Sequence, residues 1–136
     1  MKLAFAIQKN MINLKYKKCD VSINGDYYQI SFDDDPTEPE NYDDIDEVIN
    51  SIGPYFLVQF DFEFPRKECY IESDNEALRG HYIVNQVVIG SRTFTIKYGT
   101  NDSFVVNIEF DATDEEQKKL IKASKDMFRN VLHINE

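Results

Sequence analysis

Hydrophobic and polar residues alternate along most of this 136-residue chain, with the period of two that indicates β-strands. The first run contains Leu3, Phe5 and Ile7, and residues 11–16 follow the pattern less strictly. Later runs occupy residues 56–64, 68–72, 82–89, 92–98 and 104–110. Residues 56–64 predict a long central strand whose inward side chains are Phe56, Val58, Phe60, Phe62 and Phe64.

A β-hairpin is predicted around Asn24-Gly25, a dipeptide that favours the type I′ turn between antiparallel strands. A two-residue loop would place Ile23 opposite Asp26 and Cys19 opposite Ile30. In this register the apolar side chains share one face and the polar ones share the other. The inward side chains would be Cys19, Val21, Tyr28, Ile30 and Phe32.

Two segments predict helices. Apolar residues recur at helical spacing over about 42–52, before Gly53-Pro54, which would end a helix there. Thr113 and Glu116 match a capping box, and an apolar stripe predicts a helix over about 114–132. With about seven to eight strands, the chain is expected to be a single α+β domain, 1–136, with a mostly antiparallel sheet covered on one side.

Charge is distributed very unevenly. The chain has a net charge of −10, and residues 33–47 contain nine carboxylates with no Lys or Arg. Residues 33–41 are expected to form an acidic loop, and the acids of residues 43–47 would lie near the positive end of the predicted helix. This charge argues against binding nucleic-acid backbones or anionic membranes, both of which attract cationic side chains.

The two cysteines, Cys19 and Cys69, lie in predicted strands and form no CxxC pair. We expect two reduced, packed thiols rather than a disulfide. The apolar run from Leu3 to Ile7 is shorter than the core of a secretory leader, and no run reaches membrane-spanning length. A cytoplasmic location is therefore expected.

Catalytic and metal chemistry find little support in the sequence. His81 and His133 are far apart, and Asp33-Asp34-Asp35 lacks the Gly and terminal Glu of a calcium loop. Cys69 could pair with His81, but a core position is the expected alternative. Asp61 and Glu63 would share the polar side of one strand, and Tyr70 and Tyr82 are expected to pack with their hydroxyls at the edge. No cofactor is predicted.

The acidic segment has two interpretations. It could be a solvated loop that keeps the protein soluble, or a docking surface for a cationic protein, with Tyr42 as an aromatic anchor. We favour docking, and the exposed sheet face is the alternative interface. The predicted contact residues are Asp33, Asp34, Asp35, Glu38, Glu40, Tyr42, Asp43, Asp44, Asp46 and Glu47.

Several segments of the second half resemble the immunity protein 10 family of bacterial polymorphic-toxin systems. They are residues 55–59 (YFLVQ), 70–72 (YIE), 79–81 (RGH), 84–89, 94–96 (FTI), 106–110 (VNIEF) and a helix ending near Met127-Phe128. The resemblance covers roughly residues 55–128; Phe60 stands where that pattern has Arg, and residues 41–52 look like an insertion. It implies a cytosolic, non-enzymatic inhibitor that binds a cognate toxin, often a nuclease.

Together these observations predict an immunity protein that neutralises a basic toxin domain and is itself a monomer or weak dimer. One alternative is an acidic inhibitor that mimics DNA, or an interaction scaffold. A second alternative is a small enzyme that uses Asp61, Glu63 or His81.

Overall fold

The computed structural model describes residues 11–23, 27–34, 53–61 and 68–135. In these residues it contains nine strands, one α-helix and one short 3₁₀ helix. The strands are β1 (Met11–Tyr16), β2 (Lys18–Ile23), β3 (Tyr27–Asp33), β4 (Tyr55–Asp61), β5 (Glu68–Ser73), β6 (Gly80–Gly90), β7 (Thr93–Tyr98), β8 (Phe104–Phe110) and β9 (Leu132–Ile134). The helices are η1 (Glu76–Leu78) and α3 (Asp114–Met127).

The strands form one mixed sheet in the order β1-β8-β7-β6-β5-β4-β3-β2, and β9 pairs with β6 beside this path. Six neighbouring pairs are antiparallel, while β1 with β8 and β6 with β9 are parallel. The predicted α+β class with a mostly antiparallel sheet is therefore confirmed. The run at residues 11–16, which followed the alternation less strictly, is strand β1.

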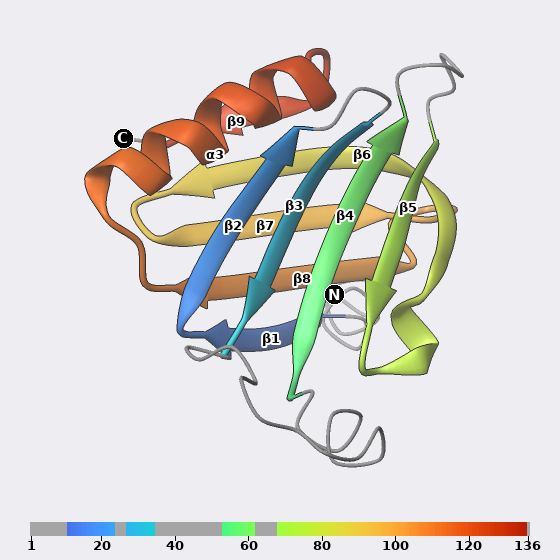
Figure 1. Ribbon diagram of the computed structural model, residues 1–136. Coiled ribbons are helices and arrows are strands. Elements are labelled where there is room, and N and C mark those ends of the chain that lie inside the picture. The colour runs from blue at the N-terminus through green and yellow to red at the C-terminus, as the bar shows by residue number, and fades with distance from the viewer. Residues whose placement is uncertain (1–10, 24–26, 35–52, 62–67, 136) are drawn as a thin grey trace, which may run out of the picture.

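The sheet folds over on itself. Strands β2 to β5 form one layer in front of β7, β8 and β1, and the long strand β6 curves from the front layer into the rear one (Figure 1). The two ends of the strand order, β1 and β2, are consecutive in the chain and separated only by Lys17. Helix α3 lies along one side of the two layers (Figure 1).

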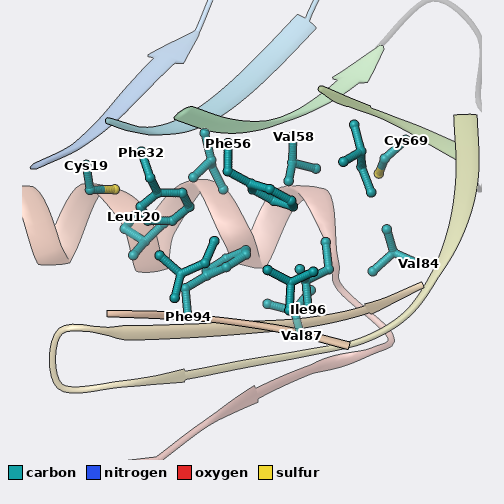
Figure 2. Close-up of a cluster of buried hydrophobic side chains, with 14 of the residues drawn as sticks. Cys19, Phe32, Phe56, Val58, Cys69, Val84, Val87, Phe94, Ile96 and Leu120 are labelled. Carbon is teal, nitrogen blue, oxygen red and sulfur yellow. The ribbon is translucent and has the colours of Figure 1, made fainter. Parts of the chain in front are cut away.

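The core fills the space between the layers, because alternate residues of every strand point into it. Phe32 and Phe56 enter from the front layer, Phe94 from the rear layer and Leu120 from α3 (Figure 2). All four side chains are fully buried. The Phe32 ring lies 5.3 Å from that of Phe94 and 5.2 Å from that of Phe110, so aromatic contacts join the two layers.

The predicted hairpin forms, but its predicted register is wrong. Ile23 pairs with Tyr28 instead of Asp26, and Cys19 pairs with Phe32 instead of Ile30. The register differs by two residues, which leaves every side chain on its predicted face because the strand period is two. Polarity alone could not distinguish the two registers, and residues 24–26, where the turn was predicted, lie outside the described part.

The C-terminal helix is shorter than predicted. It ends at Met127, and residues 132–134 form strand β9 instead of a last helical turn. Backbone bonds join Val87 N to Val131 O at 3.0 Å and Asn135 N to Ile89 O at 2.8 Å. Strand β5 pairs with β6 only from Gly80 to Ile83. Strand β9 supplies backbone hydrogen-bond partners for Val87 to Ile89, farther along the same edge of β6.

The capping box that begins α3 is confirmed: Thr113 Oγ1 accepts a hydrogen bond from Glu116 N at 3.1 Å, and Thr113 N donates to Glu116 Oε1 at 2.7 Å. The polar segment before β6 contains the 3₁₀ helix η1, which was not predicted. The strand near Leu3 to Ile7, the helix over 42–52, and the strand positions of Phe62 and Phe64 lie outside the described residues.

Candidate protein-docking surface

The front layer has an outward surface that no described element covers (Figure 1). We call the outward side chains of β2 to β5 and of the first part of β6 the outer face. The register aligns them in rows across the strands, one of which runs Gln29, Gln59, Tyr70, His81. The outer face consists of Lys18, Asp20, Ser22, Tyr27, Gln29, Ser31, Asp33, Tyr55, Leu57, Gln59, Asp61, Glu68, Tyr70, Glu72, His81 and Ile83.

A carboxylate held by two tyrosines lies on this face. The Tyr55 hydroxyl donates to Glu72 Oε2 at 3.0 Å, and the Tyr70 hydroxyl donates to Glu72 Oε1 at 2.7 Å. Both hydrogen bonds lower the pKa of Glu72, and the bond from Tyr70 has the larger effect. The positive charge of Arg79 lowers this pKa further. We call Glu72, Tyr55 and Tyr70 the Glu72 clamp; its carboxylate is ionised at neutral pH.

The clamp raises the pKa of both tyrosines. Burial is the largest cause for Tyr55, followed by the hydrogen bond to Glu72, while for Tyr70 the hydrogen bond to Glu72 is the largest cause. Both phenols are therefore protonated donors at neutral pH. Strand pairing places Leu57 of β4 directly opposite Glu72 of β5.

Neighbouring groups hold the clamp in place. The Tyr70 ring lies 5.0 Å from the imidazole ring of His81, tilted by 43°. Arg79 Nε donates to the carbonyl of Ser73 at 2.7 Å, which holds the base of its guanidinium against the chain. The backbone N–H of Tyr55 donates to Asp74 Oδ1 at 3.0 Å, which fixes the start of β4 against the end of β5.

The outer face is anionic. Lys18 lies 3.6 Å from Asp20 and 3.6 Å from Asp33, in exposed ion pairs that contribute little to stability. The acids on the face are Asp20, Asp33, Asp61, Glu68 and Glu72, and within the described part of the chain Lys18 is the only Lys or Arg among its side chains. A positively charged surface would therefore be attracted to it.

Two of the predicted contact residues lie in the described part. Asp33 ends β3 on the outer face beside Lys18, and Asp34 Oδ1 accepts a hydrogen bond from Lys17 N at 2.9 Å. Both therefore have intramolecular partners, and Asp33 alone of the two belongs to the outer face. The other predicted contacts lie outside the described residues: Asp35, Glu38, Glu40, Tyr42, Asp43, Asp44, Asp46 and Glu47.

The Glu72 clamp was not predicted from the sequence. Tyr70 and Tyr82 were both expected to be packing residues. Tyr82 packs as expected, with its ring 5.1 Å from that of buried Tyr98, whereas Tyr70 lies on the outer face and donates to Glu72. Tyr70 and Glu72 alternate with buried Cys69 and Ile71, and that alternation is the signal that could have placed them outward. The contact with Tyr55 depends on how β4 and β5 align.

The residues of the enzymatic alternatives do not come together in the described part. Cys69 pairs with Tyr82 and His81 pairs with Tyr70, so the thiol and the imidazole lie on opposite faces of the sheet. Cys19 and Cys69 are buried free thiols, as expected, and burial raises the pKa of each to about 12. Asp61 lies on the outer face, and Glu63 is outside the described residues.

A pocket of about 600 Å³ opens between Phe60 and Cys69 on one side and the connection from α3 to β9 on the other. Phe128 and Val131 give it a mostly apolar lining, with Asp126 and Arg129 among its polar residues. Neither Asp61 nor His81 lines it. Across the described residues, no group of three or more His, Cys, Asp or Glu is arranged to hold a metal ion.

In comparisons with known proteins, no family model, no curated protein and no solved structure matches the chain. Within the described residues, no helix is long and apolar enough to cross a membrane.

Proposed function

We propose that this chain is an immunity protein, similar to the immunity protein 10 family, that binds and neutralises a basic toxin domain in the cytoplasm of the producing cell. The observation that carries the proposal is the outer face, an outward sheet surface on which tyrosines lie beside carboxylates. The chain acts by binding and not by catalysis. A nuclease fits the partner, because enzymes that act on nucleic acid present cationic surfaces to it.

The composition of the outer face suits protein recognition. Tyr27, Tyr55 and Tyr70 stand among carboxylates, and tyrosine is enriched at the centres of protein interfaces. The surrounding negative charge accelerates encounter with a cationic partner and excludes anionic ones. Leu57 and Ile83 add apolar surface, and Ile83 is 51% exposed.

The acidic segment completes the interface. Residues 33–47 continue the chain from Asp33 at the edge of the outer face, so the segment with nine carboxylates begins at this surface. We assign the remaining contacts to the predicted acidic residues and to Tyr42.

The proposal is tested by co-expressing the chain with the toxin domain encoded directly upstream of its gene. We expect co-elution at one-to-one stoichiometry and survival of cells that otherwise die. The double variant Gln59→Lys, Glu68→Lys should abolish both effects. The matched control, Thr93→Lys with Glu109→Lys, makes the same charge change at exposed positions of the rear layer and should retain both.

Two outcomes would contradict the proposal. If the front-layer and rear-layer variants protect cells equally, the outer face is not the interface. If the chain instead binds several unrelated DNA-binding proteins, and salt abolishes that binding, the DNA-mimic alternative replaces the immunity protein.

A further inference from the structure

We infer that the Glu72 clamp is an arginine-selective anchor, which binds the guanidinium group of one arginine on the basic partner. The inference rests on the proposed function, because it names the chemical group that the outer face would recognise. It also assigns one residue of that face a role beyond general electrostatic attraction.

The carboxylate of Glu72 is oriented in advance. Each oxygen accepts one tyrosine hydroxyl, at 3.0 Å from Tyr55 and 2.7 Å from Tyr70, so both oxygens are fixed and each retains a further lone pair. A guanidinium presents two parallel N–H groups that match a fixed carboxylate. Binding therefore requires little additional ordering of the glutamate side chain.

The surroundings distinguish arginine from lysine. Tyr55, Tyr70 and Leu57 place aromatic rings and an aliphatic side chain next to the carboxylate. A planar, weakly hydrated guanidinium can stack on such surfaces while it donates to Glu72. A lysine ammonium is compact and strongly hydrated, so it would gain only the charge attraction.

Arg79 shows that a guanidinium is compatible with this site and also limits its strength. Its charge lowers the pKa of Glu72, while its Nε is occupied by the Ser73 carbonyl at 2.7 Å. Arg79 therefore neutralises Glu72 in part, and its guanidinium also lies close enough to Tyr55 to lower the pKa of that phenol. Substitution of Arg79 by Gln should strengthen binding of an incoming arginine severalfold.

Glu68 provides a matched control. It lies on the same strand and the same face, is exposed, and accepts no tyrosine hydrogen bond among the described residues. Glu72→Gln and Glu68→Gln remove the same charge. General attraction predicts equal effects of the two substitutions, whereas an anchor predicts different ones.

The experiment uses two peptides of equal charge, acetyl-(Gly-Arg)₄-amide and acetyl-(Gly-Lys)₄-amide, titrated into the full chain and followed by amide NMR shifts. The wild type should bind the arginine peptide about 5- to 10-fold more tightly, as one bidentate contact allows. Glu72→Gln should reduce this ratio to below about 2, while Glu68→Gln should weaken both peptides equally. Tyr55→Phe with Tyr70→Phe keeps the charge and the rings and should also reduce the ratio, which provides a second test if Glu72→Gln fails to fold.

The outcomes separate the two proposals. The anchor is refuted if the wild type binds both peptides with equal affinity, or if Glu68→Gln loses as much selectivity for arginine as Glu72→Gln does. Either result leaves the proposal of an anionic docking surface unaffected. Amide shifts that avoid β2 to β6 with both peptides overturn the docking surface as well. Shifts centred on Tyr55, Tyr70 and Glu72 with the arginine peptide alone support both.

Discussion

Replacing Phe32 with Ala should destabilise the protein more than any change on the outer face. Phe32 is fully buried, and its ring contacts Phe94 and Phe110 of the rear layer at 5.3 and 5.2 Å. Truncation of a buried Phe costs about 3–5 kcal/mol, and each aromatic pair contributes roughly 0.5–1.5 kcal/mol within such a loss. Because the ring joins both layers, we expect a loss of about 4 kcal/mol.

The free energy of unfolding is measured by urea titration with far-UV circular dichroism, since the chain has no Trp. Leu57→Ala on the neighbouring strand is the control, and its outward side chain should cost less than about 1 kcal/mol. If Phe32→Ala fails to fold, Phe32→Leu should cost roughly 1–2 kcal/mol. Losses of equal size at Phe32 and Leu57 would refute the assignment of the core to the space between the layers.

Three further predictions concern the helix cap, the thiols and the clamp. Thr113→Ala removes the capping box and should lower the free energy of unfolding by about 1 kcal/mol in the same titration, whereas an unchanged midpoint would refute the cap. Cys19 and Cys69 should react with a thiol reagent at pH 8 only after urea is added, because burial raises both pKa values to about 12; immediate reaction in native buffer would contradict this. The pKa of Glu72 is lower in the folded chain, so its contribution to stability is present above the unfolded pKa and is lost as pH falls through the folded pKa. Stability curves of wild type and Glu72→Gln should therefore converge in acid, and curves that stay parallel would count against the tyrosine bonds.

The elements that sequence reasoning found are those with a local cause. Strands such as β5 and β8 alternate because one face of each is buried, and that pattern is visible in any single run. The start of α3 follows from Thr113 and Glu116, which are three residues apart. The alternation of the strands and the capping box of α3 together predict the α+β class of the fold.

The features that could not be predicted from the sequence depend on contacts between segments that are distant in the chain. Val131 continues the apolar stripe of α3, but the open edge of β6 draws residues 132–134 into a strand. The hairpin register is set by which residues pair across the strands, and polarity is the same for registers two residues apart. Tyr55 and Glu72 are seventeen residues apart, so no local pattern could have shown that they meet.

The parallel pairing of β1 with β8 has a consequence for the order in which the sheet forms. Met11 and Val105 are partners in the parallel pair of β1 with β8, so among the described strands β1 finds its sheet partner only in β8, far along the chain. Joining segments this distant requires closing a very long loop, which slows folding. We therefore expect β1 to join the sheet late, after β8 has become available as its partner.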